Sequence, residues 1–281
     1  MESVRIVVFA VIVLSAFFQC VELDASPYLV APDEALWRGQ TDWKGELKSA
    51  VIYFERPEAP KGCEEIDAAI DAVYGNGETD ALRLGNACGM LVAVFRGDDF
   101  LAEETEVRKK FVADHEGFHL FAQLFGAGID PNLLHSTASG SDSFFDGIIE
   151  RVARTPNTDR IDKDSACELI PIHQAMKGTQ SYDYVERIVY QEWPAEYYAY
   201  TLHRRAGHTH ESYVRLRELV GSVSSYSAGV WIGQLLEELR GPHWLNELDG
   251  GYSMIDLLGM ACDDSYQSEA RRLFPLSRMT L

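Results

Sequence analysis

Hydrophobic and polar positions follow two different periods along the chain. Two apolar runs rich in β-branched and aromatic residues, SAVIYFERPEAP (49–60) and MLVAVFRGDD (90–99), predict strands. The stretch EEIDAAIDAVYGNG (64–77) between them predicts a helix that its glycines end. From about Glu103 onward apolar residues recur every three or four positions, which predicts a nearly continuous series of helices. The predicted helices span residues 103–125, 143–153, 164–177, 183–206, 211–220, 227–240 and 253–261.

Strands followed by helices are typical of the α+β class. We therefore expect a small N-terminal part that contains the strands, followed by a mostly helical bundle. The 281 residues suffice to bury a substantial core, and no linker-like stretch divides them. Residues 26–281 are expected to form a single domain.

The first residues have the pattern of an export signal. Arg5 precedes an apolar run from Ile6 to Phe18, which is shorter than the ~20 residues of a membrane-spanning helix. Two cleavage sites fit the pattern, one after Ala25 and one near Cys20. The pattern predicts a signal peptide over residues 1–25 and a secreted or periplasmic protein without stable membrane insertion beyond that signal. The alternatives are an uncleaved anchor and a plain apolar N-terminus.

The cysteines agree with export. Beyond the signal the chain has Cys63, Cys88, Cys167 and Cys262, with no CxxC pair. An even number in an oxidising compartment predicts two disulfides, and three pairings are possible. We favour Cys63–Cys88 and Cys167–Cys262, because nearby partners close smaller loops. The alternative is that some of these cysteines are simply small buried residues.

The overall charge narrows the choice of partners. The chain has 44 acidic residues against 25 lysines and arginines, a formal net charge of −19. Such a protein cannot neutralise a phosphate backbone, so no nucleic-acid partner is expected.

Candidate chemistry is concentrated in FVADHEGFHLFAQLF (111–125), within the predicted helix 103–125. His115 and His119 are one helical turn apart, so both imidazoles project toward one point, as two ligands of one zinc ion must. Glu116 is placed to act as a base on water in this HExxH pattern. Gly117 costs ~1 kcal/mol inside a helix and indicates a close approach by a neighbour. The alternative is a helix that buries two neutral histidines.

A catalytic zinc needs a third protein ligand and an open position. The longer pattern with a third histidine is absent, because Ala122 and Phe125 occupy its glycine and histidine positions. Downstream carboxylates provide the remaining candidates, namely Glu150, Glu168, Glu186, Glu192 and Glu196. Within the predicted helix 183–206, Glu192 and Glu196 share a face with two small alanines, which would allow close packing against the motif helix.

The segment EWPAEYYA (192–199) resembles the second signature of gluzincin metallopeptidases, in which a glutamate and an aromatic residue precede an alanine and an acid. This form is familiar from the CAAX prenyl protease and HtpX-like membrane peptidases. The resemblance implies a zincin-like fold, Glu192 as the third zinc ligand, and Glu196 as the hydrogen-bond partner of a motif histidine. It covers only these two helices, and the chain lacks the membrane spans of those enzymes, so their substrates do not carry over.

Pro194 departs from a straight helix at this signature. Either the helix bends there, or a new helix starts with Pro194 at its first position. In the second case Glu192 would lie just outside the helix, and Glu196 would become the better-placed ligand. A solvated acidic face remains the alternative for both glutamates.

Other residues have less defined roles. Tyr198, His208 and His210 are candidate donors to a reaction oxyanion. Asp114 is expected to be solvated or paired with a lysine. The strand GMLVAVFRG (89–97) is expected either to be an edge strand that holds an extended peptide or to be an ordinary core strand.

Together these patterns predict an exported, zinc-dependent metallopeptidase that acts on peptide or protein substrates. One zinc ion would be held by His115, His119 and Glu192, and Glu116 would be the catalytic base. Two alternatives stay open. One is a zinc amidase or esterase with a non-peptide substrate, and the other is a binding protein in which the metal only joins two helices.

Overall fold

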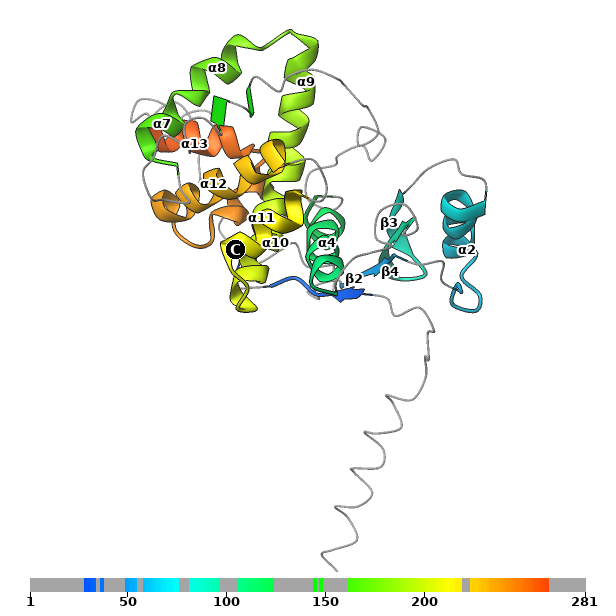
Figure 1. Ribbon diagram of the computed structural model, residues 1–281. Coiled ribbons are helices and arrows are strands. Elements are labelled where there is room, and N and C mark those ends of the chain that lie inside the picture. Colours follow the sequence, from blue (N-terminus) through cyan, green and yellow to red (C-terminus); the bar gives the residue numbers. More distant parts are fainter. Residues whose placement is uncertain are drawn as a thin grey trace, which may run out of the picture.

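The computed structural model describes residues 28–33, 36–37, 49–54, 58–75, 81–96, 106–123, 144–145, 147–148, 161–218 and 223–262 (Figure 1). This part of the chain is mixed α+β, mostly helical with a small N-terminal sheet. The predicted signal peptide lies outside the described residues. Within those residues, no helix combines the length and the hydrophobicity that crossing a membrane requires.

Four strands form the sheet. They are β1 (Tyr28–Val30), β2 (Ala50–Tyr53), β3 (Ala81–Ala87) and β4 (Met90–Phe95), in the order β1-β2-β4-β3. β2 runs parallel to β4, whereas β1 and β3 pair antiparallel to their neighbours. The strands predicted from hydrophobic runs are β2 and β4, and the runs at 49–60 and 90–99 are longer than the strands themselves.

The position of β4 decides between the two expectations for this strand, in favour of an ordinary core strand. β4 lies between β2 and β3, so it is a central strand and cannot hold a peptide by its edge. This central position explains the apolar run of β4, because a strand covered on both faces needs apolar side chains on both. Its residues Leu91, Val92, Ala93 and Val94 have no exposed surface. Within the described sheet, the outer strands are β1 and β3.

The sheet separates two groups of apolar side chains that alternate along the strands. Val92 and Val94 of β4 face α2 (Glu64–Ile70), which continues into a π-helical turn, η1 (Asp71–Gly75). Leu91 and Ala93 face the helical bundle, where they belong to the same core as Phe118. α2 and α4 (Glu106–Phe118) thus flank the sheet, as Figure 1 shows.

The bundle is built around one long helical path. This path consists of α9 (Gln180–Arg187), the π-helical turn η4 (Ile188–Glu192) and α10 (Trp193–Arg205). α10 packs against both α4 and α12 (Val223–Arg240). Gly233 of α12 permits this approach, because a Cβ there would lie 2.2 Å from the ring of Tyr197.

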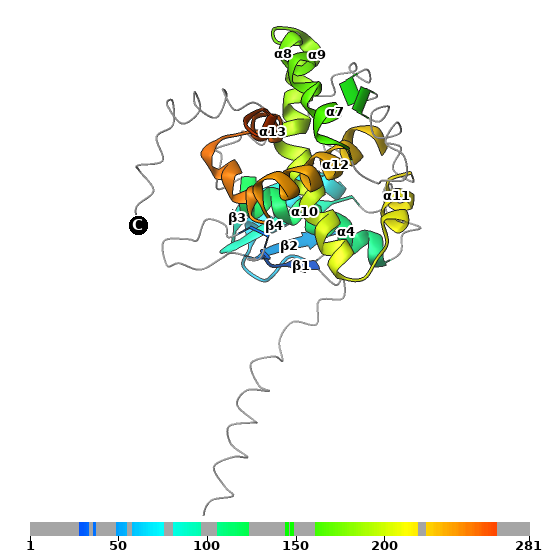
Figure 2. The ribbon, with the colours of Figure 1, turned by 90° about the vertical axis from the view of Figure 1, so that its left-hand side faces the viewer.

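Shorter helices complete the bundle around this path (Figure 2). They are α7 (Lys163–Cys167), α8 (Leu169–Ala175), α11 (His210–Glu218), the 3-10 helix η5 (Trp244–Gly250) and α13 (Met254–Cys262). α11 and α13 match the predicted helices to within a few residues, α7 and α8 together occupy the single helix predicted at 164–177, and η5 was not predicted. The predicted helix 143–153 lies largely outside the described residues, of which 144, 145, 147 and 148 are helical.

Two disulfides confirm the favoured pairing. Cys63–Cys88 joins the start of α2 to the turn between β3 and β4, and Cys167–Cys262 joins the ends of α7 and α13. Their Cα atoms are 5.9 and 5.7 Å apart, in the usual range for a disulfide. Cross-links that close loops of these lengths stabilise a fold by about 3–5 kcal/mol each in the chain-entropy account.

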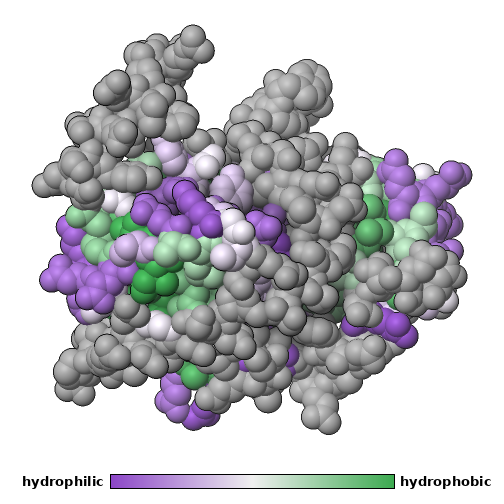
Figure 3. Space-filling model, turned by 90° about the horizontal axis from the view of Figure 1, so that it is seen from above, coloured by the Kyte–Doolittle hydropathy of each residue, from purple (hydrophilic) through white to green (hydrophobic). Residues whose placement is uncertain are grey.

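Large exposed apolar side chains are few and scattered in the described part of the chain. They come from four different elements and are Leu29, Val107, Ile172 and Leu239. From above, the described surface has small apolar areas bordered by polar residues (Figure 3). Singly exposed apolar residues of this kind are ordinary on a protein surface.

Candidate metal centre

The motif helix lies close to the sheet because of a glycine. Gly117 is buried in α4, and a Cβ there would lie 2.7 Å from Cγ1 of Val30 in β1. The close approach inferred from the sequence is therefore present, and β1 is the neighbour that requires it. Glycine at this position lets the helix that carries His115 rest directly on the sheet.

Both helices of the site contain a π-helical turn at a candidate ligand. α4 continues into η2 (His119–Gln123), which begins at His119, and η4 ends at Glu192. Such single π-helical turns inside α-helices are frequent at functional sites, because they rotate side chains relative to a regular helix. Here they belong to the two segments that bring His119 and Glu192 together.

Three donor atoms from these helices form a nearly equilateral triangle. Nε2 of His115 lies 3.1 Å from Nε2 of His119 and 3.2 Å from Oε2 of Glu192. Nε2 of His119 lies 3.4 Å from the same carboxylate oxygen. Four-coordinate zinc has bonds of about 2.0–2.2 Å, so neighbouring donors lie about 3.3 Å apart. The spacing thus fits one face of such a coordination sphere.

The other nitrogen of each imidazole has a partner that fixes the tautomer. Nδ1 of His115 lies 3.0 Å from Oε2 of Glu196. Nδ1 of His119 forms a hydrogen bond to Oε1 of Gln123, one turn further along η2. The amide of Gln123 is oriented in turn, because its Nε2 donates to the backbone carbonyl of Gln191 at 2.6 Å.

These partners leave each Nε2 with a lone pair directed into the triangle. With both imidazoles protonated on Nδ1, neither Nε2 can donate to the other or to Glu192. Two lone pairs and a carboxylate oxygen at 3.1–3.4 Å repel one another unless a positive charge lies between them. The donor set therefore fits a metal ion.

Glu116 completes the group at the motif. Its carboxylate and the imidazoles of His115 and His119 offer atoms within 4.8 Å of one another, and all three residues are buried. This buried His-Glu-His group can hold a metal ion. The site is also mostly closed to solvent, since Glu116 and Glu192 are 8 % and 9 % exposed.

The charge state of Glu192 suits a ligand. When the two imidazoles carry protons in place of a metal ion, burial raises the pKa of the Glu192 carboxyl, but the charges and hydrogen bonds of His119 and His115 outweigh this and hold the pKa well below its usual range. Glu192 is therefore ionised at neutral pH. An ionised carboxylate is the form that binds a divalent cation.

Glu196 lies on the opposite side of His115 and has a full set of partners. Its Oε1 accepts hydrogen bonds from Nε of Arg217 at 2.6 Å and from the Tyr213 hydroxyl at 2.8 Å. Its Oε2 contacts Nδ1 of His115 and a terminal nitrogen of Arg217. The carboxylate has no exposed surface, and it contacts the imidazole nitrogen of His115 that is not part of the donor triangle.

Of the two expected courses at Pro194, the one that leaves Glu192 outside the helix is not observed. α10 begins at Trp193 and places Pro194 in its first turn, where the missing N–H is tolerated. Glu192 is nevertheless helical, because η4 delivers the chain into α10 without a break. It is Glu192 that reaches the Nε2 atoms, and Glu196 that reaches Nδ1 of His115.

The three residues expected to stabilise an oxyanion contact groups outside the donor triangle. The Tyr198 hydroxyl accepts a hydrogen bond from the backbone amide of Asp33, and its ring packs against Phe118. His208 stacks on His203, and His210 contacts the Tyr200 hydroxyl.

Asp114 has the expected partner. Its carboxylate pairs with Lys110, one turn earlier on α4. Burial raises the pKa of Asp114, and Lys110 opposes that effect.

Three residues of the site were not predicted from the sequence. Gln123 is four residues after His119, a spacing that places side chains on the same helix face and could have indicated it. Tyr213 and Arg217 are also four apart, on α11. Nothing in their local sequence identifies Glu196 as their common partner, because that contact depends on tertiary packing.

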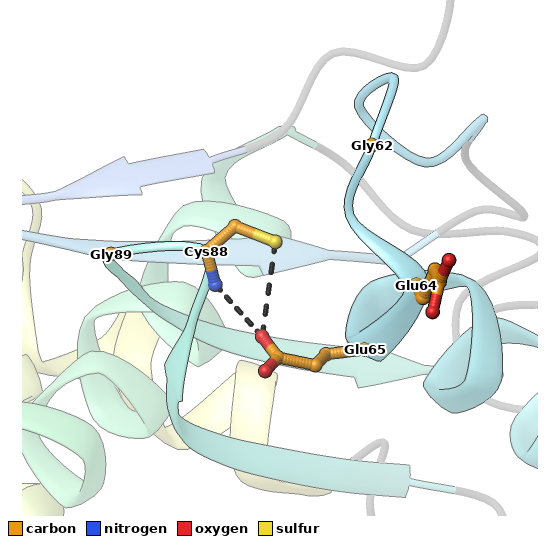
Figure 4. Close-up of a pocket in the computed structure, with 5 residues that line it drawn as sticks. All are labelled: Gly62, Glu64, Glu65, Cys88 and Gly89. Atoms are coloured by element: carbon orange, nitrogen blue, oxygen red, sulfur yellow. Dashed lines mark hydrogen bonds between the residues drawn. The ribbon is translucent and has the colours of Figure 1, made fainter.

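A second group of potential ligands consists of Cys63, Glu65 and Cys88. Two of them, Glu65 and Cys88, line a pocket together with Gly62, Glu64 and Gly89 (Figure 4). Cys63 and Cys88 are joined in a disulfide, so neither offers a thiolate to a metal. The Glu65 carboxylate accepts a hydrogen bond from the backbone N–H of Cys88 at 3.0 Å. Cys88 needs such support, because its φ of 52° is unusual for a residue with a side chain.

Comparison with known protein families, with curated proteins and with solved structures finds no match for this chain.

Proposed function

We propose that the protein is a zinc-dependent metallopeptidase of the gluzincin type. Two imidazole nitrogens and one glutamate oxygen form a common catalytic zinc ligand set, with the fourth position left for a reactant. The observation that carries the proposal is the triangle of His115, His119 and Glu192, in which both imidazoles direct lone pairs at a single point. A bound zinc ion supplies Lewis acidity and lowers the pKa of water toward ~7.

Glu116 is the proposed base. It follows His115 directly, and its carboxylate lies with the two imidazoles in one buried group. In the proposed reaction the carboxylate takes a proton from the attacking water and returns it to the leaving nitrogen. The small exposure of Glu116, 8 %, makes proton transfer to bulk water less competitive.

The sheet supports a peptide as substrate. β3 is an outer strand that packs beside η2, the segment that carries His119. Within the described sheet its partner is β4, and no other described strand pairs with it. We propose that an extended peptide adds to the outer side of β3 by main-chain hydrogen bonds, which would place a peptide bond near the metal centre.

The disulfides support export. Two cross-links that tie distant parts of the chain persist in oxidising compartments and are rare in the cytosol. Together with the N-terminal sequence pattern, they lead us to propose a secreted or periplasmic protein whose signal peptide is removed.

The deciding experiment is digestion of a mixed peptide library by zinc-loaded protein, with products identified by mass spectrometry. Wild type should cleave peptides, and Glu116→Gln should lose this activity while it retains zinc and fold. Glu106→Gln, an exposed glutamate at the start of the same helix, is the matched control and should cleave normally. Zinc-loaded wild type that cleaves nothing would contradict the peptidase proposal and leave two alternatives: a zinc amidase or esterase with a non-peptide substrate, and a metal that only joins α4 to η4.

A further inference from the structure

Arg217 holds both oxygens of the carboxylate that positions His115. Its Nε donates to Oε1 of Glu196 at 2.6 Å, and a terminal nitrogen contacts Oε2. Parallel contacts of this kind use the planar fork of guanidinium and fix the plane of a carboxylate, which a single point charge cannot do. The same Oε2 atom faces Nδ1 of His115. The guanidinium is therefore two contacts away from the donor triangle.

The guanidinium is itself held rigidly by aromatic rings. Its central carbon lies 4.5 Å from the ring centroid of Tyr226 and 5.3 Å from that of Phe111. Both rings belong to helices of the site, α12 and α4. Arg217 is 8 % exposed, and burial lowers its pKa to about 10, so it remains a cation at neutral pH.

A second residue of α11 also holds the carboxylate of Glu196. Tyr213, one turn before Arg217, donates its hydroxyl to Oε1 of Glu196 at 2.8 Å. The two residues lie on one face of α11, and both reach Glu196. A helix that contributes no candidate ligand thus fixes the orientation of a ligand on α4.

We infer that Arg217 is a positioning residue of the metal centre: by gripping Glu196 it sets the ring orientation of His115 and so the direction of its Nε2 lone pair. This inference rests on the metal site of the proposed function. Partners behind a ligand commonly change metal affinity when they are mutated, by about 10–100-fold. Arg217 acts one contact further away, through Glu196.

Metal affinity tests this inference without a substrate. Zinc affinity would be measured by chelator competition for wild type, Arg217→Gln and Arg215→Gln, each checked for fold by circular dichroism. Arg215 is the matched control, because it lies on α11 but makes an exposed ion pair with Glu211. We expect Arg217→Gln to bind zinc about 10–100-fold more weakly, and Arg215→Gln to bind it as wild type does.

A cobalt-substituted protein gives a second readout. The ligand-field bands of bound Co²⁺ report donor directions, so they should shift in Arg217→Gln and stay unchanged in Arg215→Gln. A role confined to fold stability would lower the melting temperature of Arg217→Gln without moving these bands. Folded Arg217→Gln with wild-type affinity and wild-type bands would overturn the inference.

A double-mutant cycle with Glu196→Gln tests the proposed route. If Arg217 acts through Glu196, the double variant should bind zinc no more weakly than the weaker single variant. Additive losses would overturn that route. Where Arg217→Gln does not fold, Arg217→Lys replaces it, because lysine keeps the charge but cannot grip both oxygens. Lysine should then lower affinity, and wild-type affinity would again overturn the inference.

These measurements separate the two proposals. Wild type that binds zinc but cleaves no peptide would contradict the peptidase proposal only. The zinc affinities of Arg217→Gln and Arg215→Gln would then still decide the role of Arg217. Wild type that binds no zinc would overturn both.

Discussion

Nδ1 of His115 lies 3.0 Å from Oε2 of Glu196, so the far side of this imidazole is held by a buried carboxylate. The near side presents Nε2 to His119 and Glu192. A histidine fixed in this way has a defined tautomer and little freedom to rotate, and these are the properties of a metal ligand. The same logic applies at His119, where an amide replaces the carboxylate.

Removing that amide should weaken metal binding. Gln123→Ala deletes the acceptor of the His119 Nδ1 proton and removes the side-chain donor to the Gln191 carbonyl. We expect zinc affinity to fall by about 10–100-fold, measured by chelator competition. Gln174→Ala, an exposed glutamine on α8, is the control and should bind zinc normally. Unchanged affinity in a folded Gln123→Ala would show that this hydrogen bond does not orient His119.

A methyl group at position 117 should destabilise the fold. In Gly117→Ala the new Cβ would meet Val30 at 2.7 Å, and relief of that overlap must move the motif helix away from β1. We expect a loss of about 1–3 kcal/mol in the free energy of unfolding, measured by urea denaturation. Val30→Ala in the same chain should recover part of the loss, because the two substitutions share one contact.

The control for this substitution is Gly75→Ala. Its Cβ would lie 3.7 Å from the nearest atom, an ordinary contact distance. Stability close to that of wild type is expected there. An equal loss at both positions would show that the contact with Val30 does not explain the effect at Gly117, since helix propensity alone favours alanine over glycine.

Stability should fall in mild acid because of His203. Burial, followed by the charges of His208 and Arg204, lowers its pKa in the folded state to about 4, from an unfolded value of 6.5. The folded protein keeps this imidazole neutral, whereas the unfolded chain binds a proton below pH 6.5. The contribution of His203 is therefore complete above pH 6.5 and declines as the pH falls toward 4.

Urea denaturation across that pH range checks the assignment. His203→Gln should have a shallower loss of stability between pH 6.5 and 4 than wild type. His243→Gln, an exposed histidine before η5, is the matched control and should retain the wild-type slope. A wild-type slope in His203→Gln would indicate that other groups cause the acid sensitivity.

The sequence predicted most helices and the two central strands, because their apolar periods are regular. β1 and β3 escaped prediction for physical reasons. β1 has only three residues, and β3, with Arg83, Gly85 and Asn86 in its sequence, has weak strand propensity and depends on pairing with β4. Propensity within a segment cannot report such pairing.

The candidate site divides in the same way. Local spacing identified His115, Glu116 and His119, and the resemblance of EWPAEYYA to a known signature identified Glu192 and Glu196. The π-helical turns at His119 and Glu192 have no simple sequence signal. Arg217 belongs to a helix whose packing against Glu196 is set by the whole bundle. Contacts between distant segments were therefore the part that the sequence could not provide.

The most direct test of the central claim is the zinc content of purified protein, measured by plasma mass spectrometry. Wild type should hold about one zinc ion per chain, and Glu192→Ala should hold far less. Glu64→Ala, an exposed glutamate at the start of α2, should keep the wild-type content. Zinc retained at the wild-type level in Glu192→Ala would contradict the ligand set, and wild type that takes up no zinc after reconstitution would contradict the metal centre itself.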